Sequence, residues 1–599
     1  MVPRRSVGAT GFRALSGLLI PGAIVFSMGT AQAQVQPSPP TREEVTRPAP
    51  DRPEQTGPRL TVEGDVGRGS CALDRPEYQN IRFTLTNVAF DDLRGISAEA
   101  LRPAYSNLIG QDVPIATICE IRDRAAAILT EAGYVAAVEV PEQRITDGTV
   151  RFQVLMARLV GLRVRGDAGR GERLIAAYLQ RLTQQEVFNR YEAERYLLLA
   201  GDLPGYNVRL ALRSAGAARG EVIGEVIVQR YSALADVTVQ NYGSREVGRW
   251  GVLLRGQVFG LTGLGDRTSL ALFATPDLDE QRTLQVAHDF RVGSEGLTFG
   301  GQFTYSWAQP DLGDPLIDIR SRTLFASLEA SYPFIRRQSS TLRGSAGFDL
   351  VDQDVQFNDF DLNRDRLRVI FARLTYDAVG LATGDPRYTA LTPRWRFGAV
   401  AEARQGLSLL GASDGCGAGF INCLAPNVVP PSRFEGDPTA FVLRGNLSGE
   451  FRPDPQLTFA VAARGQYSGN PLLSFEEFSA GNYTIGRGYD PGALLGDSGV
   501  GVQAEVRFGR PIPRGPDRWA FEAFAFVDQA WAWNEDRLFV VPDAELTSVG
   551  GGIRAAWGDR LRIEAMVAAP LDRTPLQAQR GDPRFLITIT TRLLPWSFR

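Results

Sequence analysis

The most restrictive feature of the sequence is a two-residue alternation of apolar and polar side chains that begins at Leu234 and recurs up to residue 593. Near the C-terminus, for example, Phe585, Ile587 and Ile589 alternate with Thr588, Thr590 and Arg592. Successive side chains of a β-strand point to opposite faces, so each such segment predicts a strand with one apolar and one polar face. A barrel in a membrane and a sandwich in water both need such strands, and the alternation alone does not separate them.

Sixteen segments follow this pattern, and the lengths of their connections separate the two folds. The predicted strands are 234–242, 248–259, 266–275, 281–292, 297–309, 320–333, 338–351, 364–377, 393–406, 437–451, 455–468, 498–510, 518–533, 545–557, 560–570 and 583–593. Most connections after even-numbered strands are short, whereas the two longest, 407–436 and 469–497, follow odd-numbered strands. Bacterial outer-membrane barrels have this asymmetry, which a soluble sandwich does not need. The sequence therefore predicts a mainly β protein with a 16-stranded antiparallel transmembrane β-barrel over residues 231–599, wide enough for an aqueous lumen.

Residues 78–230 contain two successive units in which both helices and strands are predicted. In the first unit, 78–160, a strand at 81–88 precedes a helix capped by Ser97, a helix at 115–132, and strands at 134–140 and 149–155. In the second unit, 161–230, a strand at 162–165 precedes helices at 172–182 and 189–199, and strands at 206–213 and 220–229. We interpret the two units as duplicates of one small fold, a sheet covered by helices.

The first 77 residues predict export and a linker. Residues 1–33 combine early arginines, a short apolar stretch and an Ala31-Gln32-Ala33 cleavage site, as in a secretory signal peptide. The apolar stretch is too short to span a bilayer, so we expect cleavage before Gln34. Residues 34–77 are rich in proline and charge and predict a periplasmic linker, in which prolines bound a single helical turn at 41–45.

The composition excludes several classes of function. The chain has no lysine and one histidine, His288, which excludes lysine-dependent chemistry, histidine-based triads and multi-histidine metal sites. Acidic and basic residues nearly cancel, 68 against 65, so nothing indicates attraction to nucleic acid. We find neither a nucleotide site nor a nucleophile–base constellation, and we predict no enzymatic activity and no cofactor.

Several short motifs occur in a fixed order along the chain. They are Gly133-Tyr134-Val135 with VPEQRITDG at 140–148, LLLAGDLPG at 197–205, Asn241-Tyr242-Gly243-Ser244, Gly263-Leu264-Gly265-Asp266, and SVGGGIR at 548–554. Together they resemble the two-partner secretion transporters, which are the hemolysin activation/secretion proteins of the ShlB/FhaC/HecB family. The resemblance covers nearly the whole chain after residue 33, and it implies that the two α/β units are periplasmic POTRA domains.

The resemblance also implies a function. Transporters of this family carry a large, unfolded exoprotein across the outer membrane of a Gram-negative bacterium without ATP, in the type V secretion route, and their POTRA domains recognise it. The matched residues of the first motif give the client recognition region, namely Gly133, Tyr134, Pro141, Gln143, Asp147 and Gly148. An extended client can add a strand to a free sheet edge, where main-chain hydrogen bonds supply affinity.

Two further motif matches concern the barrel interior. Ile485-Gly486-Arg487-Gly488-Tyr489 resembles the family's VRGY/F loop motif with an additional Gly486, and Phe526-Val527-Asp528-Gln529-Ala530 resembles FxDxG with Ala530 in place of Gly. The family implies that this loop folds back into the barrel, where the Arg meets the Asp. We therefore predict a loop-to-wall lock of Arg487, Gly488, Tyr489, Phe526 and Asp528. The alternation agrees, because Asp528 has the parity of Glu522, opposite to that of Phe521, Ala523, Ala525 and Val527.

The four cysteines form two candidate pairs. Cys416 and Cys423 lie close together in the loop 407–436, and export to an oxidising compartment favours a disulfide between them. Cys71 and Cys119 lie in or beside the first α/β unit, where a disulfide would tie the linker to the unit's second helix.

Two other functions remain open, an outer-membrane assembly insertase of the same superfamily and a passive porin or receptor. The secretion-type motifs argue against the first, and the second does not need α/β units. The expected partners are a hemolysin- or adhesin-like exoprotein, outer-membrane lipids and the barrel-assembly machinery, with no nucleic acid and no nucleotide; we expect a monomer. An N-terminal helix can occupy the pore in this family, but the prolines here depart from that pattern, so the sequence leaves a plug helix undecided.

Overall fold

The structure is a computed structural model, and it describes residues 40–46, 60–62, 71, 73, 75–78, 80–214, 220–314, 316–380, 385, 387–389, 391–538, 542–575 and 579–594. The predicted signal peptide at 1–33 and most of the predicted linker at 34–77 lie outside these residues. All of the described residues belong to one compact unit, Val35–Arg599.

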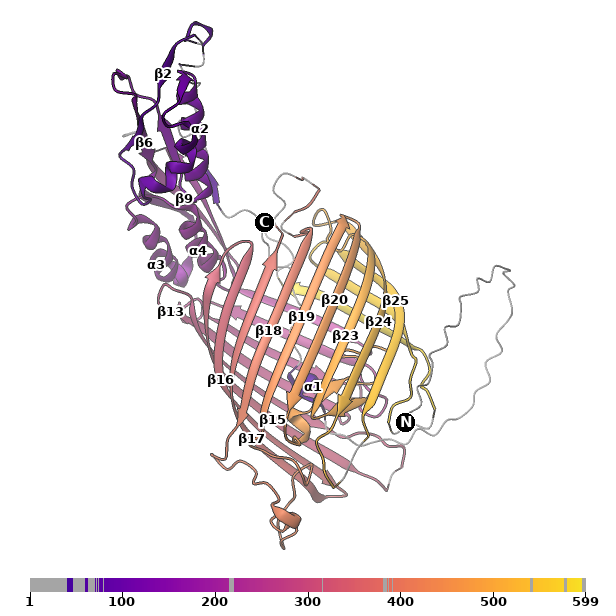
Figure 1. The fold of residues 1–599 in the computed structure, drawn as a ribbon. Helices are drawn as coiled ribbons and strands as arrows, with labels where there is room; N and C mark the ends of the chain where they lie inside the picture. Colours follow the sequence, from indigo (N-terminus) through magenta and orange to yellow (C-terminus); the bar gives the residue numbers. More distant parts are fainter. Residues whose placement is uncertain are drawn as a thin grey trace, which may run out of the picture. The chain divides into compact units, whose positions relative to one another are not determined.

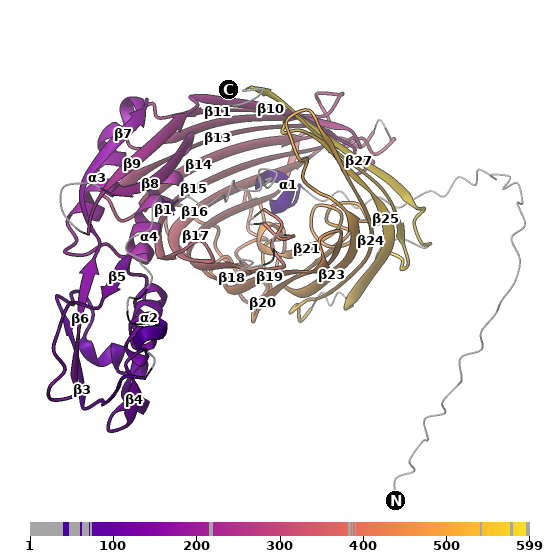
Figure 2. The ribbon, with the colours of Figure 1, turned by 90° about the horizontal axis from the view of Figure 1, so that it is seen from above.

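Sixteen antiparallel strands close into one barrel (Figures 1 and 2). They are β10 (Ala233–Gln240), β11 (Gly251–Phe259), β12 (Arg267–Ala274), β13 (Gln281–Val292), β14 (Leu297–Ala308), β15 (Ile319–Arg336), β16 (Ser340–Phe357), β17 (Phe360–Val379), β18 (Trp395–Gly406), β19 (Phe441–Asp454), β20 (Leu457–Ser468), β23 (Ser498–Gly509), β24 (Trp519–Trp533), β25 (Ala544–Trp557), β26 (Leu561–Pro570) and β27 (Arg584–Leu594). Strand β10 pairs with β27 and so completes the ring. The predicted 16-stranded barrel is confirmed, and each predicted strand overlaps one of these.

Side chains alternate across the barrel wall as the sequence predicts. In β24, Phe521 and Val527 are exposed to 58% and 44%, whereas Glu522 and Asp528 are exposed to only 4% and 0%. The apolar face therefore points outward and the charged face points into the barrel, as predicted for Asp528. Among the described residues, no helix is long and apolar enough to cross a membrane.

The two ends of the barrel differ in the length of their connections. Loop 407–440 joins β18 to β19, and loop 469–497 joins β20 to β23. Both lie at the end that we call the long-loop end. At the opposite end, turns as short as 293–296 and 455–456 suffice.

The first α/β unit holds its sheet in the order β3-β6-β5, with β2 and β4 paired beside it. Its elements are β2 (Arg82–Thr84), β3 (Asn87–Asp91), η3 (Ala98–Ala104), η4 (Ser106–Leu108), β4 (Asp112–Pro114), α2 (Thr117–Glu131), β5 (Ala136–Glu139) and β6 (Thr149–Met156), preceded by η2 (Pro76–Tyr78). The helix expected after Ser97 is only a 3₁₀ helix, and the Ser97 side chain makes no capping hydrogen bond. Pro103 lies within it and lacks the N–H that a continuing α-helix needs.

The second α/β unit repeats the topology of the first. Its elements are β7 (Arg158–Gly166), η5 (Gly169–Gly171), α3 (Glu172–Thr183), α4 (Arg190–Gly201), β8 (Tyr206–Ser214) and β9 (Glu221–Arg230). In the sheets β3-β6-β5 and β8-β9-β7, the first strand in the sequence pairs in parallel with the last, and the last pairs antiparallel with the remaining one. This shared order supports the duplication inferred from the sequence, while the exact boundaries of the units stay predictions.

The second unit gains a fourth strand and touches the barrel. Strand β1 (Leu60–Val62) pairs in parallel with β8, so the sheet order is β1-β8-β9-β7. At the barrel end with short turns, Arg336 donates from Nε and Nη2 to the two carboxylate oxygens of Asp202, at 2.6 Å each. Arg195 donates to the carbonyl oxygen of Pro333 at 3.1 Å. These contacts join the second unit to the end opposite the long loops.

Candidate functional site inside the barrel

Loop 469–497 folds into the barrel rather than away from it. Within the loop, η7 (Ser474–Glu476) precedes a small hairpin of β21 (Phe478–Ala480) and β22 (Leu494–Gly496). Phe478, Ile485 and Leu494 are buried in one apolar cluster with Ala530 of β24 and Leu546 of β25. The apolar side chains of the loop thus hold it against the inner wall.

At the tip of this loop, Arg487 meets Asp528 on β24. The Nε and Nη2 atoms of Arg487 donate to Asp528 Oδ2 and Oδ1 at 3.0 and 2.6 Å, and its backbone N–H donates to Oδ2 at 2.9 Å. Asp528 is completely buried and Arg487 is 7% exposed. A guanidinium that binds a carboxylate through two parallel bonds fixes both distance and orientation.

A second carboxylate and an aromatic ring complete the surroundings of Arg487. Its Nη1 also pairs with Glu505 on β23, and its guanidinium carbon lies 3.5 Å from the centre of the Phe526 ring. Glu505 was not predicted from the sequence. In the hairpin of β23 and β24, Glu505 pairs with Phe526 and lies two residues from Gln503, which pairs with Asp528. The register of these two strands is therefore the signal that could have identified Glu505.

The residues beside Arg487 allow the loop to lie directly on the wall. A Cβ on Gly488 would come within 2.8 Å of Ser548 Cβ and 2.9 Å of the Pro570 backbone nitrogen, so only glycine fits there. The Tyr489 hydroxyl donates to the Thr547 carbonyl oxygen at 2.7 Å. The structure therefore brings together all five residues of the predicted lock.

A short helix also lies within the barrel. Helix α1 (Arg42–Thr46) is enclosed by the ring of strands in Figure 2. The Thr41 backbone N–H donates to Glu44 Oε2 at 2.9 Å and the Glu44 N–H donates to Thr41 Oγ1 at 3.4 Å, a reciprocal cap that supports so short a helix. Val45 is buried with Phe325 and Phe475, which belong to the wall and to loop 469–497. The sequence left open whether an N-terminal helix occupies the pore, and the structure places the five-residue helix α1 there.

Glu43 fastens α1 by its charge. Arg464 of β20 donates to Glu43 Oε1 at 2.8 Å, and Ser479 of loop 469–497 donates to Oε2 at 3.1 Å. Burial opposes the ionisation of Glu43, but Arg42 and Arg464 lower its pKa to about 2. The carboxylate therefore stays charged and links α1 both to the wall and to the loop.

Helix α1 and the loop border a large cavity. The cavity has a volume of about 2040 Å³ and is lined by Arg42 and Glu43 of α1, by residues 482–485 of the loop and by charged groups of the wall. Residues 201–207 of the second α/β unit also line it. Within the described residues, no group of three or more His, Cys, Asp or Glu side chains is placed to hold a metal ion.

The residues of the predicted recognition region make contacts within the first unit and with the second. Asp147 accepts from the Thr149 backbone N–H at 3.1 Å, and Gln143 accepts from the Arg151 N–H at 2.8 Å. A Cβ on Gly148 would meet the Thr84 carbonyl oxygen at 2.3 Å. These residues, which follow Pro141, hold the turn between β5 and β6.

Gly133 and Tyr134 lie where the two units meet. The Arg190 backbone N–H donates to the Gly133 carbonyl oxygen at 2.8 Å, and Tyr134 forms a β-bridge with Asn189. Within the first unit, the Tyr134 hydroxyl donates to the Gly95 carbonyl oxygen at 2.5 Å. Their contacts connect the end of α2 to the start of α4.

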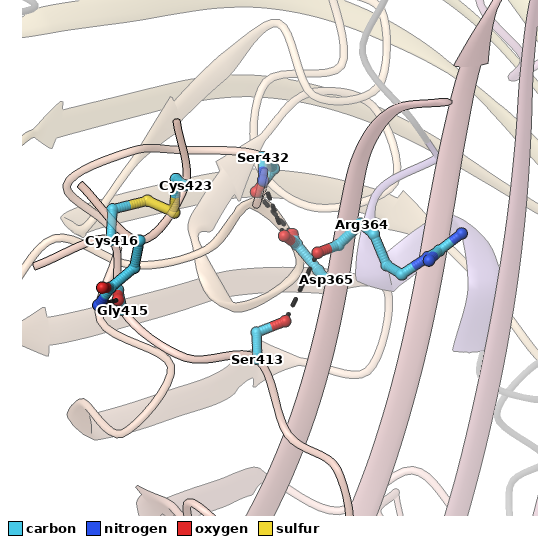
Figure 3. The surroundings of a disulfide bond; sticks show 8 residues. Arg364, Asp365, Ser413, Gly415, Cys416, Cys423 and Ser432 are labelled. Carbon is cyan, nitrogen blue, oxygen red and sulfur yellow. Dashed lines mark hydrogen bonds between the residues drawn. A yellow bond between two sulfur atoms is a disulfide. The ribbon is translucent and has the colours of Figure 1, made fainter. Parts of the chain in front are cut away.

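Both predicted disulfides are present. Cys71 is bonded to Cys119 of α2, and Cys416 is bonded to Cys423 in loop 407–440. Figure 3 shows that the second disulfide lies beside two contacts of this loop with β17, from Ser413 to Arg364 and from Ser432 to Asp365.

Comparisons with known proteins place this architecture among exporters. A family model described as haemolysin secretion/activation protein ShlB/FhaC/HecB matches residues 228–555, and a model of the ShlB-type POTRA domain matches residues 83–156. The heme/hemopexin transporter protein HuxB of Haemophilus influenzae is 22% identical over 509 residues, which cover 82% of this chain and 85% of that protein.

Two solved structures have a similar fold. CdiB from Escherichia coli matches with a TM-score of 0.69 and 14% identity, over 90% of this chain and 94% of that one. CdiB from Acinetobacter baumannii matches with a TM-score of 0.61 and 16% identity, over 92% and 95% of the two chains.

Proposed function

The chain belongs to the ShlB/FhaC/HecB family of haemolysin secretion/activation proteins, which are two-partner secretion transporters, and we propose that it exports one large, unfolded exoprotein through its barrel. The α/β units and the short-turn end lie in the periplasm in this proposal, and the long-loop end faces the outside of the cell. Folding of the exoprotein outside withdraws the chain by mass action, so no ATP is needed.

The observation that carries the proposal is a lumen with a built-in obstruction. Helix α1 and loop 469–497 both lie inside the barrel and are joined through Glu43 and Ser479. Each is held to the wall by charged contacts, Glu43 with Arg464 and Arg487 with Asp528. These contacts suit a transporter of large chains, which needs its pore closed between clients.

The sheet edges of the α/β units suit an extended client. In the second unit, β1 already covers the β8 edge, which leaves β7 at the other edge of the sheet. In the first unit, β3 and β5 are the two edge strands. A client strand that adds to such an edge is bound by main-chain hydrogen bonds with little demand on its side chains. The recognition region around Gly133 and Gly148 would then act by shaping β5 and β6.

From the α/β units, the client would pass into the cavity inside the barrel. Residues 201–207 line its wall near the second unit, and they overlap the LLLAGDLPG motif at 197–205. A client released from the α/β units would enter the cavity at this segment and meet α1 and loop 469–497.

Deletion of residues 78–160 tests the assignment of recognition to the first unit. We expect export of the exoprotein that a deletion strain fails to release into the medium to stop, while the barrel still folds and inserts, as judged by heat-modifiable mobility in gels. The intact chain treated in parallel is the control. Unchanged export from the deletion variant would contradict the proposal.

A separate observation distinguishes an assembly insertase. Loss of an insertase lowers the amounts of many outer-membrane proteins, whereas loss of a dedicated transporter removes one exoprotein from the medium. Quantitative proteomics of outer membranes and culture supernatants from a deletion strain separates the two outcomes.

A further inference from the structure

A second charged cluster lies at the long-loop end of the barrel, apart from the loop-to-wall lock. Arg433, on loop 407–440, donates from Nη1 to Glu477 Oε1 at 2.8 Å and to the Leu472 carbonyl oxygen at 3.0 Å. Its Nη2 donates to Asp497 Oδ2 at 3.1 Å and also pairs with Asp536. We call Arg433, Glu477, Asp497 and Asp536 the Arg433 cluster.

The cluster joins three separate loops. Arg433 comes from loop 407–440, Glu477 and Asp497 come from loop 469–497, and Asp536 follows β24. Glu435 strengthens the third link, because it accepts from the backbone N–H groups of Arg537 and Leu538 at 2.8 Å each. Loop 407–440 thus binds both of the other loops, which also contact each other directly, because the Glu535 backbone N–H donates to Asp497 Oδ2 at 2.8 Å.

Loop 407–440 is itself fixed to the barrel on the far side of Arg433. Ser432 donates to Asp365 of β17 from its backbone nitrogen at 2.8 Å and from its hydroxyl at 2.6 Å (Figure 3). Strand β17 is the eighth of the barrel and β24 is the thirteenth. Residues 432–435 therefore connect the ends of strands that lie five positions apart, across one side of the mouth.

The charges of the cluster make Arg433 its decisive member. Three carboxylates surround one guanidinium, and the side chains of Glu477, Asp497 and Asp536 are exposed to only 8%, 0% and 6%. Without the guanidinium these buried acidic groups would lose the donor that they share and would draw water. All three belong to loops, so they can separate without breaking a barrel strand.

We propose that loop 407–440 is a lid on the outer mouth of the barrel, that Arg433 latches it to loop 469–497, and that the latch opens when a client leaves. The inference rests on the proposed function, which places the long-loop end outside the cell. Loop 407–440 thus has a task separate from that of Arg487. The lock of Arg487 positions the tip of loop 469–497 inside the barrel, whereas the latch of Arg433 covers the base of loop 469–497.

Labelling of a buried reporter tests the latch without any client. Leu472 is 1% exposed beneath the cluster, and the four native cysteines are all bonded, so Leu472→Cys supplies the one free thiol. The probe is a bulky, membrane-impermeant maleimide added to intact cells. We expect Arg433→Ala to speed labelling at least about tenfold, with Arg433→Lys between it and the parent. Arg245→Ala, an exposed arginine of the loop 241–250, is the matched control.

Equal labelling rates in the parent and in Arg433→Ala would overturn the latch. If the alanine variant fails to fold, as judged by heat-modifiable mobility, Arg433→Lys decides the question, because lysine keeps the charge but lacks the fork that spans Asp497 and Asp536. A lysine variant that labels no faster than the parent then overturns it.

A reversible bridge tests whether the lid must open for export. Glu435→Cys and Leu538→Cys, joined from outside by a short, reducible bis-thiosulfonate, should stop export of the exoprotein that a deletion strain fails to release, and reduction should restore it. Continued export through the bridged lid would overturn the inference. A parent chain that exports nothing under the same treatment would count against the proposed function instead, and the labelling result would still decide the latch.

Discussion

Loop 469–497 is held at several places, including Glu476, which pairs with Arg404 and Arg444 of the wall. Two of these places, the tip and the base, differ in which elements carry the partner groups. At the tip, Arg487 meets Asp528 and Glu505, which lie on the paired strands β24 and β23. At the base, Arg433 meets Glu477, Asp497 and Asp536, which lie in loops. The partners of Arg487 therefore belong to strands of the barrel wall, whereas the partners of Arg433 belong to loops.

This difference indicates a division of work. A charged pair fixed to hydrogen-bonded strands sets one geometry and contributes more to specificity than to net stability. A charged cluster between loops can be broken at lower cost, because no sheet hydrogen bonds are lost with it. We infer that the tip contact positions the loop and that the base contact opens and closes.

The largest effect is expected at the tip. Arg487→Ala should lower export at least about tenfold, and Arg487→Lys should fall nearly as far, because lysine cannot form two parallel bonds to Asp528. The measurement is exoprotein in the medium per folded barrel, with Arg245→Ala as the control. Full export from Arg487→Lys would show that charge alone is enough and would remove the geometric argument.

A pH series should affect the base and leave the tip geometry unchanged. Burial raises the pKa of Glu477 to about 8 from an ordinary 4.5; Arg433 opposes the rise, and Asp497, Asp536 and Asp365 add to it. The closed cluster therefore binds a proton more tightly than an open one. Its contribution to closure is complete below about pH 4.5 and is lost as the pH rises through about 8.

The reporter Leu472→Cys makes this pH effect measurable. Its maleimide labelling, relative to that of a cysteine placed at the exposed Arg245, should rise several-fold from about pH 6 to about pH 9. Glu477→Gln cannot ionise and should flatten the profile. A profile that keeps its slope in Glu477→Gln would exclude Glu477 as the titrating group.

Glu505→Gln should lower export less than the substitutions of Arg487 and Asp528 do. Glu505 also pairs with Arg507 and Arg554, and each of these arginines has another carboxylate, Glu450 or Glu522. Arg487 in turn keeps Asp528. We expect export to fall by about two- to fivefold, less than in Asp528→Ala. An equal loss in the two variants would mean that both carboxylates are needed for the lock.

The disulfide of the lid should have the smallest effect on export. Cys416 and Cys423 are seven residues apart, so their bond closes a short loop worth about 2–3 kcal/mol in chain-entropy terms. The bond involves neither Arg433 nor Ser432, and the Ser432–Asp365 contact would remain without it. We expect Cys416→Ser with Cys423→Ser to change export less than twofold. Non-reducing peptide mapping of the parent should show the loop peptide bonded to itself.

How far the sequence predicts this molecule depends on the range of each interaction. The sixteen strands were predictable because an alternation of apolar and polar residues is local, and the facing of Asp528 followed from the same parity. The pairing of Arg487 with Asp528 came from the family resemblance and not from the alternation. The segment after Ser97 forms a 3₁₀ helix and not the expected helix, because Pro103 interrupts it although Ser97 is a favourable capping residue.

Long-range contacts account for what the sequence did not predict. Arg433 is one of many loop arginines, and nothing near it in sequence points to Glu477 or Asp536. Helix α1 has a local signal in Thr41 and Glu44, but five residues are too few for a stable isolated helix. Its place in the lumen depends on Arg464, more than four hundred residues away.

A double-mutant cycle on Arg487 and Asp528 tests the central claim most directly. The measurement is exoprotein exported per folded barrel for Arg487→Ala, Asp528→Ala and the double variant, with folding judged by heat-modifiable mobility. If the two residues act through one contact, the double variant should export within about twofold of the worse single variant, because one contact cannot be lost twice. If the two losses multiply instead, the residues act independently and the loop-to-wall lock is contradicted.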